Sequence, residues 1–146
     1  MDRKIRFRPL GLKANVRAMT HRFAIRVYYE DTDMGGIVYH ANFLKFIERA
    51  RSEWVAGLGL DQNAMRDDGI VFAVRRVEAD YMLPARYGDE LEVRTTTASI
   101  SGARLVMDQK VVRGEEILFT AQVTVACITM DGRPVRLPAG IRKIVN

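Results

Sequence analysis

The sequence predicts an α+β protein in which one long helix covers a five-stranded antiparallel sheet. One strand-like stretch near the N-terminus is followed by a single long amphipathic run, and four further strand-like stretches then follow with short connections. Strands joined by short turns pair in antiparallel fashion, and one face of such a sheet can be covered by a single helix. Such a sheet also has an exposed edge, which pairing with a second copy of the chain would satisfy.

The first predicted strand covers residues 22–29, RFAIRVYY. Its larger apolar side chains occur at every second position, which is typical of a strand with one buried face. These residues are Phe23, Ile25, Val27 and Tyr29. The acidic, glycine-containing bend EDTDMGG then ends the strand.

A long helix is predicted next, because apolar residues recur at spacings of three and four. This apolar stripe consists of Phe43, Phe46, Ile47, Ala50, Trp54 and Leu58. We expect the helix to begin between Tyr39 and Asn42. We expect it to end at Gly57 or Gly59, because glycine commonly terminates helices.

The rest of the chain is predicted to form a loop at residues 61–69 and then four strands. The strands are expected at residues 70–82, 90–100, 103–112 and 117–130, and a proline-containing tail follows them. Pro84 and Gly88 separate the first two of these strands. The pairs Ser-Gly at 101–102 and Asp-Gly at 131–132 are suitable for tight turns.

Length and composition indicate one globular domain with a basic extension. The chain has 146 residues and a net charge of +5. The first 26 residues carry a charge of +7, however, so the remainder carries −2. We expect residues 1–20 to be a poorly ordered basic extension and residues 21–146 to be the folded domain. The near-neutral body argues against a nucleic-acid-binding module.

The sequence also predicts the compartment of the protein. No apolar run approaches the roughly 18 residues that a membrane span needs. The N-terminus lacks the apolar core of a secretory signal. The single cysteine, Cys127, allows no internal disulfide and is expected to be a small buried residue in a reducing compartment. We therefore expect a cytoplasmic protein without a membrane span.

The acidic bend before the helix could form a site for acyl transfer. The first amides of a helix lack intrahelical partners, and the helix dipole favours negative charge there. Gly35 and Gly36 would let a substrate carbonyl approach this backbone closely. One of Glu30, Asp31 and Asp33 could then attack the acyl carbon or activate a water. A thioester suits this arrangement better than an amide, although acidic bends before helices are more often surface loops or caps.

The motif YYEDTDMGGIVYHANF, followed by ERARSEW, resembles the signature of acyl-CoA thioesterases of the 4-hydroxybenzoyl-CoA thioesterase type. The nearest match is similar to the bacterial subfamily encoded alongside the Tol–Pal envelope system. The resemblance extends from about Phe23 to Ile144 and includes YMLPARYGDELEV. It implies the hotdog fold, in which the sheet wraps around one long central helix.

The resemblance also implies roles for individual residues. Asp33, the second Asp of the Asp-x-Asp pair, matches the catalytic carboxylate of the family, and Asp31 is then a structural acid. Tyr39 and His40 lie where helix-start amides of the family polarise the thioester carbonyl, and the His40 side chain can assist. Gly36 is expected to be a substrate-binding residue together with Tyr39. Met34 stands where the family often has alanine, and this could narrow the mouth of the pocket.

Other residues are assigned less specific roles. The phosphates of CoA require cations, and among Arg75, Arg76, Arg86 and Arg104 the resemblance favours Arg104. Glu48 is expected to be a solvated or ion-paired helix residue. His21 lies outside the motif and is expected to be exposed.

The sequence thus predicts hydrolysis of an acyl-CoA, or of an acyl carrier protein thioester, to a free acid and a thiol. The enzyme is expected to be a homodimer or homotetramer that needs no cofactor and no metal. One alternative is a non-catalytic acyl-binding hotdog scaffold in envelope biogenesis, which would have no need for Asp33. A hotdog dehydratase is the other alternative, but it would require a different acid–base pair.

Overall fold

A computed structural model describes residues 20–145 of the chain. Its centre is one five-stranded antiparallel sheet with strand order β1-β3-β4-β5-β2. The strands are β1 (His21–Arg26), β2 (Ile70–Tyr81), β3 (Glu90–Ser101), β4 (Arg104–Arg113) and β5 (Glu116–Thr129). The predicted α+β class and the five antiparallel strands are confirmed, and β1 and β2 are the two edge strands.

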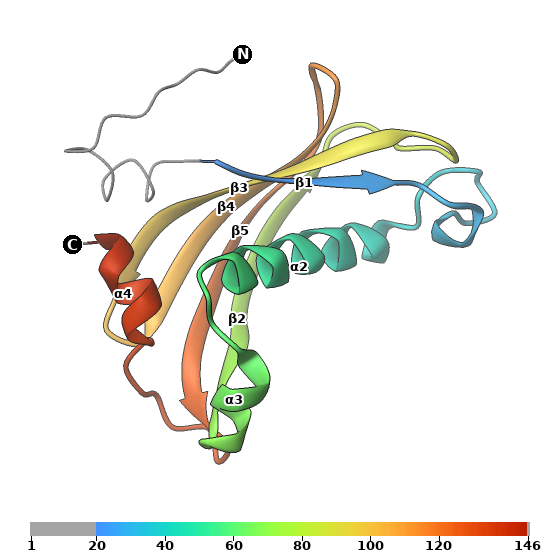
Figure 1. The fold of residues 1–146 in the computed structure, drawn as a ribbon. Coiled ribbons are helices and arrows are strands. Elements are labelled where there is room, and N and C mark those ends of the chain that lie inside the picture. Colours follow the sequence, from blue (N-terminus) through green and yellow to red (C-terminus); the bar gives the residue numbers. More distant parts are fainter. Residues whose placement is uncertain (1–19, 146) are drawn as a thin grey trace.

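The long helix α2 (His40–Gly57) lies across the inner face of the sheet, which bends around it (Figure 1). Both predicted ends of this helix are correct. Phe43, Phe46, Ile47 and Ala50 are buried because their spacing places them on the side that faces the sheet. They form the main core together with inward-facing strand residues such as Phe119.

A second, smaller core lies beneath the C-terminal half of α2. Leu105, Met107 and Cys127 of the sheet are buried there against Leu137 and Ile141 from the C-terminal segment. The expectation that Cys127 is buried is thus confirmed, and burial raises the pKa of its thiol.

Two short helices occur where the sequence predicted a loop and a tail. The first, α3 (Gln62–Asp67), is capped by the Asp61 side chain, which accepts hydrogen bonds from the amides of Asn63 and Ala64. The second, α4 (Ala139–Val145), contributes Ile141 to the second core. Both are too short to show a clear helical repeat in the sequence.

The N-terminal strand also differs from its prediction. It ends at Arg26 rather than near Tyr29, and a 3-10 turn, η2 (Tyr29–Asp31), follows. His21 is the first residue of β1 and pairs with Thr95, so the expectation that it is an exposed extension residue is wrong. Residues 1–19 lie outside the described residues, and so does most of the predicted basic extension. Within the described residues, no helix is long and apolar enough to cross a bilayer.

Candidate active site

The acidic loop between η2 and α2 is held in place by backbone hydrogen bonds to its neighbours. The Val38 amide donates to the Ala85 carbonyl over 2.8 Å, and Ile37 pairs with Arg86. Ala85 and Arg86 belong to the segment 82–89, which connects β2 to β3. The YMLPARYGDELEV part of the motif therefore contacts the acidic part, although about 50 residues separate them in sequence.

The segment 82–89 is itself anchored by an ion pair. Arg113 of β4 donates to Asp89 over 2.8 Å and to the Pro84 carbonyl over 3.2 Å. Burial alone would raise the pKa of Asp89, but hydrogen bonds from the Arg86 amide and the Arg113 guanidinium outweigh it and lower that pKa. Asp89 is therefore ionised at neutral pH and keeps the segment fixed.

Asp31 has the contacts of a structural acid. Its side chain is buried and accepts a hydrogen bond from the Tyr28 amide over 2.9 Å. Its carbonyl accepts from the Tyr39 amide and from the Asn42 side chain, each over 2.9 Å. Asp31 thus joins the turn before the acidic loop to the start of the helix.

Asp33 presents an exposed carboxylate in the same loop. One of its oxygens, Oδ1, accepts a hydrogen bond from the Gly35 amide over 2.8 Å. Among residues 20–145, no donor lies within hydrogen-bond distance of the other oxygen, Oδ2. The Asp33 backbone is fixed at both ends, since its amide donates to Ile37 and its carbonyl accepts from Gly36. Asp33 is thus held by its backbone while one oxygen is available for chemistry.

The two glycines of the loop have different functions. Gly36 has a φ of 80°, a conformation that other residues adopt only with strain. Gly35 has no such conformation, but a Cβ atom there would lie 3.2 Å from Asp33 Oδ1. Gly36 therefore forms the turn, and Gly35 leaves space for the Asp33 carboxylate.

The helix start offers donors for an oxyanion, but the Tyr39 amide is not among them. Tyr39 occupies the N-cap position of α2, and its amide donates to the Asp31 carbonyl over 2.9 Å. In the described part of the chain, the amides of His40 and Ala41 have no such acceptor. The expectation for Tyr39 is therefore corrected: its amide is occupied, and the His40 and Ala41 amides are the ones that can meet a substrate oxygen.

The His40 side chain is exposed and lies beside two aromatic rings. Its ring centroid is 4.8 Å from that of Tyr39 and 6.0 Å from that of Tyr81, the last residue of β2. The Tyr81 hydroxyl donates to the His40 carbonyl over 3.0 Å. The first turn of α2 is therefore connected to the end of an edge strand.

Met34 is fully exposed, so its side chain does not line a pocket of this protomer.

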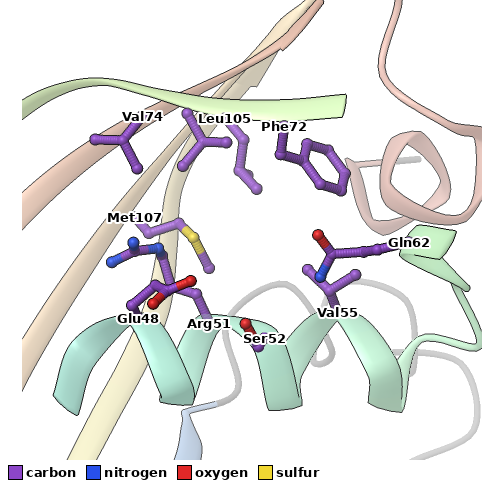
Figure 2. A pocket seen from close by; sticks show the side chains of 10 residues that line it. Glu48, Arg51, Ser52, Val55, Gln62, Phe72, Val74, Leu105 and Met107 are labelled. Carbon is purple, nitrogen blue, oxygen red and sulfur yellow. The ribbon is translucent and has the colours of Figure 1, made fainter. Parts of the chain in front are cut away.

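A cavity of about 230 Å³ lies along the C-terminal half of α2. Figure 2 shows Glu48, Arg51 and Ser52 on the helix side, facing Phe72, Val74 and Leu105 of the sheet. Arg51 lies eleven residues after His40, a separation of roughly 16 Å along a helix. Within one protomer the cavity and Asp33 are therefore apart.

Buried polar residues hold Arg51 at the wall of this cavity. The Gln109 side-chain nitrogen donates to the Ile47 carbonyl over 2.9 Å and to the Thr95 hydroxyl over 3.0 Å. These two bonds direct the Gln109 oxygen towards Arg51, which donates to it over 3.0 Å. Burial lowers the pKa of Arg51, while the charge of Glu48 acts in the opposite direction. No residue in the range 20–145 forms an ion pair with Glu48, which lines the cavity and is exposed.

The predicted phosphate-binding residue Arg104 is not near Asp33 in the protomer. It begins β4 at the tight turn after β3, whereas the acidic loop lies near the opposite end of β3. A strand of this length spans roughly 36 Å. Arg86 pairs with Ile37 and is the arginine in direct contact with the loop. Arg75 and Arg76 lie on the edge strand β2.

An antiparallel sheet bent around one long helix, with an acidic glycine-containing loop at the helix start, is the architecture of the hotdog thioesterases. The chain belongs to the thioesterase-like superfamily, whose family profile matches residues 27–145. The predicted hotdog fold and the prediction of a thioester hydrolase are both confirmed.

Individual relatives agree with this membership. The chain is 41% identical over 122 residues to the acyl-CoA thioester hydrolase YbgC of Escherichia coli, which covers 82% of this chain and 91% of that enzyme. It is 38% identical to the acyl-CoA thioesterase YbgC of Haemophilus influenzae, with 82% and 90% covered. A crystal structure of a probable thioesterase from Bartonella henselae has a TM-score of 0.74 and 39% identity, and covers 82% of this chain and 98% of that one. A 1,4-dihydroxy-2-naphthoyl-CoA thioesterase from Synechocystis has a TM-score of 0.81 and 26% identity, with 87% and 96% covered.

Sequence reasoning did not identify Ala41, Gln109 or Tyr81. The donor at Ala41 is a backbone amide, so no side chain in the sequence indicates it. Gln109 lies in an otherwise alternating strand, where a polar residue on the buried face could have indicated a polar contact. Tyr81 was included in a predicted strand, but the sequence does not show that this strand ends at the helix start.

Proposed function

We propose that the protein hydrolyses acyl-CoA thioesters with Asp33 as the reacting carboxylate. One observation carries this proposal: among residues 20–145, one Asp33 oxygen has no donor, and it lies in a fixed loop before the His40 and Ala41 amides, which have no acceptor within the same range. Hydrogen-bond donors and a carboxylate are the two groups that thioester hydrolysis requires. The names of the relatives, which include two acyl-CoA thioesterases, support CoA as the thiol.

In the proposed reaction, the thioester oxygen accepts hydrogen bonds from the His40 and Ala41 amides. Negative charge then develops on that oxygen at the positive end of the α2 dipole. Asp33 either removes a proton from an attacking water or attacks the acyl carbon itself. In the first route the carbon–sulfur bond breaks, the leaving thiolate takes up the proton removed from water, and a free acid is released. In the second route the departing thiolate leaves a mixed anhydride on Asp33; a water molecule hydrolyses this anhydride, which regenerates the carboxylate and releases the free acid, and a proton of that water passes to the thiolate. The imidazole of His40 can donate an additional hydrogen bond at the same end.

We further propose that the working form is a homodimer, or a homotetramer built from dimers. The edge strand β2 is 12 residues long, and among residues 20–145 no strand pairs with its outer side. Val74 and Val77 on it are exposed, and together with the exposed Leu44 of α2 they line a groove beside this edge. Pairing of two β2 strands around a two-fold axis would cover these residues.

Such a dimer supplies a role for the cavity and for Arg104. The cavity of one protomer would face the acidic loop of the other and receive the acyl group between Phe72, Val74 and Leu105. Arg104 and Gly36 would contribute to substrate binding from different protomers. Met34, which is fully exposed in the protomer, would border the shared site.

The proposed subfamily rests on the motif at residues 28–54 and on the sequence identity to the YbgC enzymes. We propose that the protein belongs to the subfamily encoded beside the Tol–Pal system and acts in the cytoplasm. Acyl carrier protein thioesters are proposed as alternative substrates to CoA thioesters. The basic segment 1–20 is proposed to be dispensable for hydrolysis.

Replacing Asp33 with Asn tests the central assignment. The amide keeps the size of the side chain and its oxygen can still accept from Gly35, but the reacting charge is lost. We expect thioester hydrolysis to fall by about two to four orders of magnitude, as for removal of a general base. The unfolding midpoint and the oligomeric state should not change. The measurement is the rate of free thiol release from short, long and aromatic acyl-CoAs.

The matched control is Asp67→Asn, because Asp67 is an exposed carboxylate on α3, remote from the loop. Full activity in Asp33→Asn would reject Asp33 as the reacting group. If the unmodified protein binds acyl-CoA but hydrolyses none of the tested thioesters, the non-catalytic scaffold is the better assignment.

A further inference from the structure

Tyr81 stands where the last residue of β2 meets the first turn of α2. Its hydroxyl donates to the His40 carbonyl over 3.0 Å. Its ring packs edge-on against Phe43 and Phe119, with centroid distances of 5.8 and 4.9 Å. The ring is thus fixed by the core, while the hydroxyl reaches the helix start.

The hydrogen bond from Tyr81 is not needed to satisfy a buried group. The first carbonyl of an α-helix already accepts from the amide four residues later, and a carbonyl oxygen has two lone pairs. The Tyr81 side chain is 49% exposed, so its hydroxyl could bond to water instead. What this bond does is fix the first turn of α2 relative to the end of β2. Burial raises the pKa of Tyr81, so the hydroxyl retains the proton that it donates.

The same stretch of chain also fixes the loop that carries Asp33. Four residues after Tyr81, the Ala85 carbonyl accepts from the Val38 amide, and Arg86 pairs with Ile37. Ile37 in turn accepts the hydrogen bond of the Asp33 amide over 2.9 Å. Residues 81–86 therefore hold both halves of the site: Tyr81 contacts the donor side, and residues 85 and 86 contact the carboxylate side.

We propose that Tyr81 is a positioning residue that sets the His40 and Ala41 amides at their working distance from Asp33. The proposal rests on the proposed function, because it presupposes that these amides bind the substrate oxygen. The proposal also concerns the His40 imidazole, whose ring lies close to the rings of both Tyr39 and Tyr81. Tyr81 contacts His40 through both its hydroxyl and its ring, and it reaches no reacting atom itself.

The test is Tyr81→Phe, which keeps the ring packing and removes only the hydroxyl. Small displacements of groups in a site cost up to about 100-fold in rate, so we expect kcat to fall by about 3- to 30-fold. KM should change less than twofold, because binding contacts elsewhere remain. The unfolding midpoint should stay the same, since no buried group loses its partner. The matched control is Tyr87→Phe, at an exposed tyrosine that contacts Tyr29 and not His40.

A second readout separates positioning from a purely structural effect. The chain contains only two histidines, so the imidazole signals in an NMR spectrum come from His21 and His40. Tyr81→Phe should shift the His40 signals and leave those of His21 unchanged. A His21→Gln variant assigns the two sets.

Each outcome decides the proposal. Unchanged kcat in Tyr81→Phe, or unchanged His40 signals, overturns it. A lower kcat together with a lower unfolding midpoint and shifted His21 signals also overturns it, because the effect is then general. Asp33→Asn measured in parallel tells the two proposals apart. If Asp33→Asn is inactive while Tyr81→Phe is fully active, only the role of Tyr81 is wrong. If Asp33→Asn is fully active, both proposals fail.

Discussion

Gly35 shows how a residue without a side chain can determine the position of a neighbouring carboxylate. A Cβ atom at this position would lie 3.2 Å from Asp33 Oδ1, closer than such contacts usually are. The Asp33 carboxylate would then have to move by a few tenths of an ångström and weaken its bond to the Gly35 amide. The exact position of this carboxylate therefore depends on the neighbouring glycine.

We expect Gly35→Ala to lower kcat by about tenfold while the protein stays folded, because small displacements of a reacting group are costly. The measurement is steady-state hydrolysis of an acyl-CoA, combined with thermal unfolding. Gly57→Ala is the control, since nothing lies within 4 Å of a Cβ at that helix end. A Gly35→Ala enzyme as active as Gly57→Ala would show that the carboxylate tolerates displacement.

At the residue scale, the sequence could predict the types of groups but not their hydrogen bonds. Asp33 was assigned from the motif, and one of its oxygens has no donor in the part of the chain that the structure describes. The Tyr39 amide was expected to be a donor and is instead bonded to Asp31. Tyr39 and Ala41 both neighbour His40 in sequence. Which of these amides has an acceptor within residues 20–145 depends on the path of the backbone, which the sequence does not show.

At the element scale, the contact between α2 and the sheet contains a buried polar group. Gln109 of β4 is 1% exposed, and its side chain contacts Ile47 of the helix, Thr95 of β3 and Arg51. Its amide nitrogen thus donates twice and its oxygen accepts once, and these bonds join α2, β3 and β4. Removal of this amide would leave the partly buried Arg51 guanidinium without its partner.

We expect Gln109→Leu to lower the free energy of unfolding by about 1–3 kcal/mol, the usual cost of leaving buried polar groups unpaired. Urea denaturation followed by circular dichroism measures it. Gln122→Leu is the matched control, because Gln122 lies exposed on the neighbouring strand β5. Among residues 20–145, its side chain bonds only to the Asp108 side chain. Equal stability of the two variants would mean that the Gln109 contacts contribute nothing.

The elements with the strongest periodicity were also the ones predicted best. Helix α2 was placed correctly because its apolar stripe extends over about four turns. Helices α3 and α4 were missed, because six and seven residues give no clear periodicity. Their formation depends on the Asp61 cap and on packing of Ile141 into the second core, and neither follows from a local pattern.

At the scale of the whole molecule, the parts of the proposed site are distributed along the helix. The amides of His40 and Ala41 lie at one end of α2, while the cavity lies roughly 16 Å further along it. Sequence resemblance assigned Asp33 and Arg104 to one site, but the two residues lie near opposite ends of β3 within the protomer. A two-fold axis beside β2 would bring the loop of one protomer to the cavity of the other.

We therefore expect Val77→Lys to dissociate the assembly and lower activity together. Val77 is 40% exposed on the edge strand, and two lysines facing each other across a two-fold axis repel and resist burial. The measurement is molar mass by light scattering, with acyl-CoA hydrolysis on the same samples. Ile117→Lys is the control, since Ile117 is 38% exposed on β5, which is an inner strand between β4 and β2 and not an edge strand. Loss of the assembly with full activity would show that one protomer contains a complete site, and an intact Val77→Lys assembly would place the interface elsewhere.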